Sequence, residues 1–182
     1  MKTKFFTLFA LISALFIVST TNANAQEYPK NTAKVKYQGE IMSGFGFGIG
    51  EFAIDRVYVH TIQGVKIGRY FSTGLGIGVN IIPLYVFGSN TEVYMPIYVN
   101  AKGYLPLGKK TSLYLSFDLG GSFGVTYGAA EFRGFMCMPA VGVSIVNRVN
   151  ISFGYELQRL STGISGLSFN MGALAIKLGV RF

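Results

Sequence analysis

The stretch FSTGLGIGVNI, residues 71–81, decides the fold. Its large apolar residues recur at every second position, and the residues between them are serine, glycine and asparagine. A period of two puts each set on its own face of a β-strand, whereas an α-helix would mix glycine and isoleucine on one face. The uncharged segment around it, residues 70–91, is long enough for a membrane helix, but Asn80, Pro83 and the alternation argue against one. The stretch therefore predicts a strand with one apolar face and one small or polar face.

The same alternation recurs after residue 25 and predicts eight strands in a single domain. Their expected ranges are 34–49, 56–66, 70–82, 93–105, 111–126, 134–146, 150–159 and 169–182. Short connections alternate with longer ones along the chain, as in an up-and-down arrangement of antiparallel strands.

The N-terminus has the three parts of a secretory signal peptide. These are a positive start, an uncharged apolar run and an A-x-A cleavage motif, found at Lys2 and Lys4, residues 5–18, and Ala23 and Ala25. The apolar run is shorter than the ~20 residues that a spanning helix needs. We expect cleavage before Gln26, which leaves residues 1–25 as the signal peptide and 26–182 as the barrel.

The composition indicates which strand face lies outside. Only 13% of the 182 residues are charged, against about 25% in soluble domains, and the face opposite the apolar one carries mainly Gly, Ser, Tyr and Asn. A soluble barrel would need many Lys and Glu on that face. We therefore expect the apolar face to meet lipid and the small and polar face to fill the lumen. A tilted strand from residue 71 to residue 81 spans about 25 Å, the height of the apolar band of a membrane barrel.

These observations predict an all-β, eight-stranded antiparallel up-and-down transmembrane β-barrel. With an even number of strands, the N-terminal and C-terminal ends of the chain lie on the same side of the membrane. With short turns on the inner side, the expected location is the outer membrane of a diderm bacterium with periplasmic termini.

Four segments resemble the small OmpA/OmpX-like outer-membrane β-barrel domains, whose function is uncharacterised. They are YQGE at 37–40, GFGFGIG at 44–50, residues 56–80, and ALAIKLGVRF at 173–182. The resemblance implies an outer-membrane location and carries over no catalytic residue. The terminal Phe182 resembles the signal by which such barrels engage the barrel-assembly machinery, although Lys177 stands where the family pattern favours glycine.

Inward-facing charges form the main candidate site. Counted from the strand ends, Lys177 would lie between Glu40 and Glu156 at one height, as an ionic plug of the lumen or, alternatively, as an ion or proton gate. The plug is the favoured interpretation, and on it Lys177→Met would lower the unfolding midpoint. Further candidate members of this network are Asp118, Lys102, His60 and Arg56.

The inward glycines of the ascending strands have two possible roles. They could leave a small water-filled vestibule, or they could make room for inward tyrosines and histidine of neighbouring strands. The tyrosines at 58, 94, 98 and 104 favour the second role.

Catalysis has little support in the sequence. Some eight-stranded barrels modify lipid A with a His, a Ser and an acid, but His60 is the sole histidine and parity puts it in the lumen. No cluster suggests a metal site, and we expect no cofactor. The function expected first is a non-enzymatic structural or surface-interaction role with a filled lumen. A narrow pore for ions or very small solutes and a lipid A-modifying enzyme remain the alternatives.

The basic residues are expected at the periplasmic end, as a rim against anionic phospholipid head groups. They are Lys34, Lys36, Lys66, Arg69, Lys109, Lys110, Arg148 and Arg181. The expected partners are outer-membrane lipids, lipopolysaccharide and the assembly machinery. We expect no nucleic acid, and we expect a monomer.

Overall fold

The structure is a computed structural model that describes residues 35–50, 53–83, 91–126, 133–161 and 168–182. The expected cleavage site at Ala23, Ala25 and Gln26 lies outside these residues. No helix in the described part of the chain is long and apolar enough to cross a membrane.

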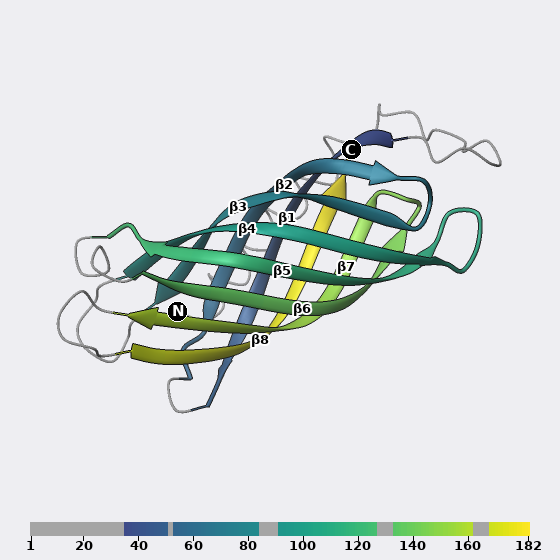
Figure 1. Ribbon diagram of the computed structural model, residues 1–182. Coiled ribbons are helices and arrows are strands. Elements are labelled where there is room, and N and C mark those ends of the chain that lie inside the picture. Colours follow the sequence, from purple (N-terminus) through teal and green to yellow (C-terminus); the bar gives the residue numbers. More distant parts are fainter. Residues whose placement is uncertain (1–34, 51–52, 84–90, 127–132, 162–167) are drawn as a thin grey trace.

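Eight strands close into an antiparallel barrel in which every strand pairs with its neighbours in sequence (Figure 1). They are β1 (Val35–Ile49), β2 (Arg56–Ile67), β3 (Phe71–Pro83), β4 (Thr91–Pro106), β5 (Ser112–Gly124), β6 (Arg133–Ile145), β7 (Val149–Ser161) and β8 (Ser168–Arg181). The barrel closes where β1 pairs with β8, from Glu40 opposite Arg181 to Ile49 opposite Gly172. The predicted fold class is confirmed, and each predicted strand boundary lies within two residues of the observed one.

The two ends of the barrel differ. At the short-turn end, β2, β4 and β6 each return through a brief turn, at residues 68–70, 107–111 and 146–148, and β8 finishes at Arg181. The opposite, long-loop end holds the strand ends between which the longer connections run in sequence: β1 to β2, β3 to β4, β5 to β6 and β7 to β8. Figure 1 shows these two ends at the right and the left of the barrel.

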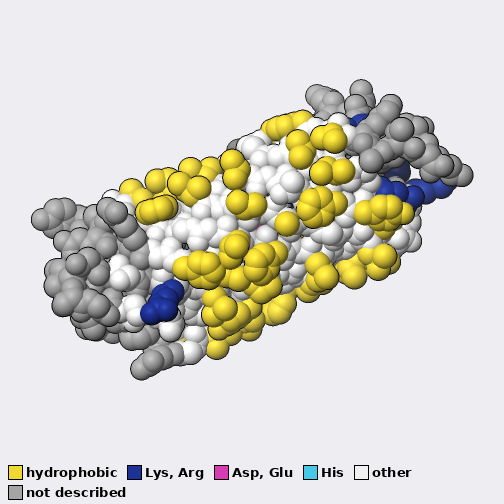
Figure 2. Space-filling model, viewed as in Figure 1, with side chains coloured by type: hydrophobic (Ala, Val, Ile, Leu, Met, Phe, Trp, Pro, Cys, Tyr) yellow, Lys and Arg dark blue, Asp and Glu magenta, His cyan; other side chains and the backbone are white. Residues whose placement is uncertain are grey.

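Side-chain burial follows the predicted alternation. Outward residues such as Leu75 and Leu115 are 66% and 67% exposed, whereas the inward Arg56 and Asn80 are fully buried. Figure 2 shows apolar side chains along the wall, with Lys and Arg side chains only near its two ends. An apolar exterior around a polar interior is the reverse of a soluble domain. It suits a closed barrel in lipid, where every backbone group must be paired within the protein.

Several inward glycines make room for rings from the adjoining strand. A Cβ atom added at any of them would collide with a ring, in the pairs Gly46 with Tyr58, Gly76 with Tyr98, Gly78 with His60, and Gly142 with Tyr114. Gly46, Gly76 and Gly78 therefore admit large lumen side chains, as the second of the two interpretations predicted, and they do not line an open vestibule. Gly142 on β6, which was not among the predicted glycines, does the same for Tyr114.

Candidate functional site: the polar lumen

The lumen holds a column of buried polar side chains from six strands. All seven predicted members face inward and are at most 4% exposed: Glu40, Arg56, His60, Lys102, Asp118, Glu156 and Lys177. Parity along each strand explains their placement, because each occupies the face opposite the apolar wall. Two ion pairs and several hydrogen bonds connect them in separate groups, some of which cross the barrel.

Glu156 on β7 is the centre of the contacts toward the long-loop end. Arg56 Nη1 lies 3.4 Å from its Oε2, and the Tyr58 hydroxyl donates to the same oxygen at 2.5 Å. Asn80 Nδ2 donates to Oε1 at 3.3 Å. Arg56 Nη1 also donates to Gln158 Oε1 at 3.0 Å. A buried carboxylate with a cation and two further donors has the partners that such a charge requires away from water.

His60 on β2 continues this chain into the middle of the lumen. Its Nε2 lies 2.7 Å from Asn80 Oδ1, and its Nδ1 lies 3.1 Å from the Tyr98 hydroxyl and 3.4 Å from Lys177 Nζ. Because the Asn80 amide nitrogen donates to Glu156, its oxygen faces the ring, so Nε2 carries a proton. Nδ1 is then the acceptor for its neighbours, and the ammonium nitrogen of Lys177 is one of them.

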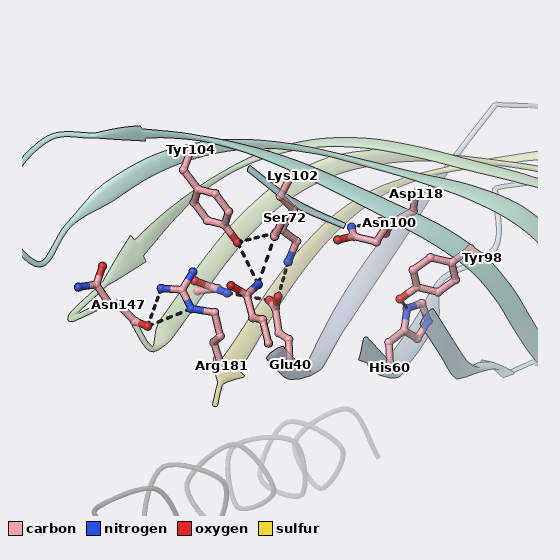
Figure 3. Close-up of polar contacts among 12 residues, drawn as sticks. Glu40, His60, Ser72, Tyr98, Asn100, Lys102, Tyr104, Asp118, Asn147 and Arg181 are labelled. Atoms are coloured by element: carbon pink, nitrogen blue, oxygen red, sulfur yellow. Dashed lines mark hydrogen bonds and ion pairs between the residues drawn. The ribbon is translucent and has the colours of Figure 1, made fainter. Parts of the chain in front are cut away.

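Glu40 on β1 forms a second ion pair nearer the short-turn end. Lys102 Nζ on β4 contacts Glu40 Oε2, and Asn150 Nδ2 donates to Oε1 at 2.8 Å. Figure 3 shows Lys102 reaching across the lumen to Glu40 from the opposite wall. Asp118, also in this view, accepts from Asn100 Nδ2 at 2.5 Å.

The predicted position of Lys177 between two carboxylates at one height is wrong. Across the β1–β8 pair Lys177 lies opposite Gly44, and Glu40 lies opposite Arg181. Across the β7–β8 pair Glu156 lies opposite Ala173. The two carboxylates are thus displaced by four positions along β8, in opposite directions from Lys177. The stagger of strands that closes a barrel causes the difference, because heights counted from strand ends ignore it.

Two residues that the sequence analysis placed in the basic periplasmic rim line the inside of the short-turn mouth. Lys66 and Arg181 point inward and are only 7% and 6% exposed. Both contact the ring of Tyr104, with Lys66 Nζ at 4.3 Å and Arg181 Cζ at 5.5 Å from its centroid. The Tyr104 hydroxyl accepts from Gln38 Nε2 and from the Ser72 hydroxyl, each at 3.3 Å. The signal that could have identified them is parity along each strand, because Lys66 shares the parity of His60 on β2 and Arg181 shares that of Lys177 on β8.

The described residues near the long-loop end include an apolar cluster inside the barrel. Ile82, Tyr94 and Met171 form a buried cluster inside the barrel, and Ile54 from the β1–β2 connection packs against it. Asp55 Oδ1 accepts from the Gly48 backbone nitrogen at 3.1 Å, which fastens that connection to β1. Along β3 and β8, Ile82 and Met171 lie closer to the long-loop end than Asn80 and Lys177 do.

The C-terminal residue is joined to the first strand. Phe182 and Gly39 exchange two backbone hydrogen bonds of 2.9 Å, and the Phe182 ring lies so close to Gly39 that a Cβ there would collide with it. The described residues contain no group of three or more His, Cys, Asp or Glu that could hold a metal ion.

Comparison with known proteins relates this geometry to solved barrels. No family model matches the chain, and no curated protein matches it in sequence. The crystal structure of the outer membrane enzyme PagL aligns with a TM-score of 0.56 and 7% identity, covering 78% of this chain and 98% of PagL. The chain has the fold of the small outer-membrane barrels. Neisserial surface protein A, NspA, aligns with a TM-score of 0.55 and 15% identity, covering 81% of this chain and 97% of NspA. At these identities the likeness concerns the fold alone.

Proposed function

We propose that this protein is a non-enzymatic outer-membrane barrel with a side-chain-filled lumen and a structural or surface-interaction role in the envelope. The observation that carries the proposal is the lumen itself. Arg56, Tyr58, Glu156 and His60 fill it at one level and Glu40 and Lys102 at another, all of them buried. An eight-stranded barrel is only wide enough for side chains to fill, so these residues leave the wall and the outer connections as the surfaces for interaction.

The proposed location rests on the apolar wall and on the fold shared with PagL and NspA, whose names place them in an outer membrane and at a cell surface. β1 begins and β8 ends at the same end of the barrel as the short turns. In membrane barrels the short turns are periplasmic, so this arrangement favours periplasmic termini. In this setting outer-membrane lipids and lipopolysaccharide surround the barrel, which we expect to be a monomer. The exposed ring of Phe182 is the proposed contact for the assembly machinery.

Fractionation of expressing cells tests the location, combined with gel electrophoresis of heated and unheated samples. We expect the protein in the outer-membrane fraction, with a mobility that changes on heating as the barrel unfolds. A deletion strain with altered sensitivity to detergents would support the envelope role. Recovery of a soluble, detergent-independent protein would contradict the proposal.

A narrow pore is the second candidate, and the continuity of the polar column favours it. Polar side chains succeed one another from Arg181 at one mouth to Gln158 near the other. Purified protein in liposomes distinguishes the candidates, since uptake of small ions and solutes is expected only from a pore.

Lipid A modification is the third candidate, because PagL is described as an enzyme. The surroundings of His60 argue against this activity for this chain. Among the described residues its ring nitrogens contact Asn80, Tyr98 and Lys177 and no serine or carboxylate, and the side chain is 2% exposed inside the barrel. An acyl chain in the membrane has no access to it. Mass spectrometry of lipid A with and without expression tests this candidate.

A further inference from the structure

One edge of the Arg56 guanidinium is unpaired inside the lumen. The side chain is fully buried, and its Nη1 reaches Glu156 Oε2 at 3.4 Å and Gln158 Oε1 at 3.0 Å. Nε and Nη2 have no hydrogen-bond partner among the described residues. These two nitrogens form the side of the planar guanidinium that binds an acceptor with two parallel hydrogen bonds. Buried donors without an acceptor are costly, so this edge is a candidate binding site.

Gln158 adds a further donor beside this guanidinium. Its Oε1 accepts from Arg56, which orients the amide, and its buried Nε2 has no partner in the described part of the chain. The two side chains come from β2 and β7, strands that do not pair, and they meet across the lumen. Three unpaired nitrogens thus belong to two side chains in direct contact, and all three are donors.

The neighbouring carboxylate is already engaged. Glu156 Oε2 accepts from Arg56 Nη1 and from the Tyr58 hydroxyl at 2.5 Å, and its Oε1 accepts from Asn80 Nδ2 at 3.3 Å. If Glu156 turned toward the free edge of the guanidinium, Tyr58 and Asn80 would lose their buried acceptor. The free donors therefore need an acceptor other than Glu156.

Apolar side chains adjoin the free donors. Met171 lies opposite Gln158 in the β7–β8 register and belongs to the buried cluster with Ile82 and Tyr94. In such low-dielectric surroundings a hydrogen bond to a cation is stronger, and an unpaired donor costs more. A water molecule placed here would need acceptors for its own two hydrogens. An anion accepts from all the donors and needs no further partner.

We propose that the lumen binds a small monovalent anion, with chloride as the probe, at the Nε–Nη2 edge of Arg56 and beside Nε2 of Gln158. The interior of an eight-stranded barrel is just wide enough for side chains, so the anion has at most a few atoms. It completes the pairing of a guanidinium whose Nη1 is held by Glu156. A lumen with a bound ion is still filled, so the inference does not depend on the role proposed above.

Thermal unfolding of the purified barrel in a neutral detergent tests the proposal. Sodium chloride is compared with sodium gluconate, whose anion is too large for the lumen, at equal ionic strength. A ligand that binds only the folded state raises the melting temperature in a saturable way, and we expect this rise with chloride and not with gluconate. Crystals grown in bromide give the location, since the anomalous signal should lie within hydrogen-bond distance of Arg56 Nε and Nη2. Equal effects of the two salts, or no bromide at Arg56, would overturn the proposal.

Substitutions show whether the two residues are responsible. Arg56→Lys keeps a positive partner for Glu156 but removes the bidentate edge, and we expect it to weaken the apparent chloride affinity about tenfold or more. Gln158→Met removes one donor and should weaken it severalfold, which keeps the test decisive if Arg56→Lys fails to fold. Arg159→Gln, which removes the exposed cation next to Gln158 on β7, is the matched control and should bind as the wild type. A chloride response that survives unchanged in both lumen variants, or that Arg159→Gln weakens equally, would overturn the proposal.

Discussion

Lys177 Nζ lies 3.4 Å from Nδ1 of His60, and neither ion pair of the described residues includes this lysine. The opposite ring nitrogen faces Asn80, whose amide is oriented by Glu156. His60 and Asn80 thus form a hydrogen-bonded connection between the Lys177 cation and the Glu156 carboxylate. Lys177 and Glu156 therefore interact through these hydrogen bonds and not through a direct ion pair.

This series of hydrogen bonds predicts the tautomer of His60. We expect a neutral ring at pH 7 with its proton on Nε2, because Nδ1 must accept from Lys177 or Tyr98. Nitrogen-15 NMR of the folded, histidine-labelled barrel measures the tautomer. A proton on Nδ1 would contradict this series of hydrogen bonds. In Asn80→Leu, which removes the acceptor at Nε2, the tautomer preference should weaken.

Two lumen lysines are expected to differ in their contribution to stability. Lys102→Met leaves Glu40 buried with a single amide donor and should cost ~3–5 kcal/mol. Lys177→Met breaks no ion pair of the described residues and should cost clearly less, contrary to the expectation from sequence. Urea unfolding of both variants in the same lipid vesicles measures the difference. Equal losses of unfolding free energy in the two variants would show that Lys177 compensates a buried carboxylate as strongly as Lys102 does.

Lys102 and Lys177 illustrate which features of the site the sequence could predict and which it could not. Alternation predicted every strand and placed Lys177, Glu40 and Glu156 inside correctly, because burial follows residue parity. It could not predict which charges meet, since partners such as Lys102 and Glu40 come from strands that do not pair directly. Those contacts depend on the stagger of the closed barrel and on side-chain length across the lumen. The burial of Lys66 and Arg181 escaped prediction because positive residues near strand ends are typical of a rim.

Charged substitutions on the wall test whether it faces lipid. Leu75→Arg places a charge within the apolar band and should destabilise the inserted barrel by ~2–4 kcal/mol. Val35→Arg, at the first residue of β1, should cost at most about 1 kcal/mol, since it lies at the barrel end. Unfolding from vesicles compares them, and similar small losses at both positions would argue against a lipid-facing wall.

The strained β6–β7 turn offers a stabilising substitution. Val146 has a φ of 52°, a left-handed conformation that asparagine tolerates better than a β-branched residue. We expect Val146→Asn to raise the free energy of unfolding by ~1 kcal/mol. Denaturant unfolding checks this, with Val143→Asn on the adjoining strand as a control that should not stabilise. An unchanged or lower stability in Val146→Asn would show that the turn is not strained.

The filled lumen is tested most directly by conductance across planar bilayers. We expect the purified wild-type barrel to give no steady current. Buried side chains occupy its lumen, both at the level of Glu40 and at the level of Glu156. A variant with Arg56, Tyr58 and Tyr98 replaced by serine should conduct and would show that insertion succeeded. Steady open-channel currents from the wild-type protein would contradict the account.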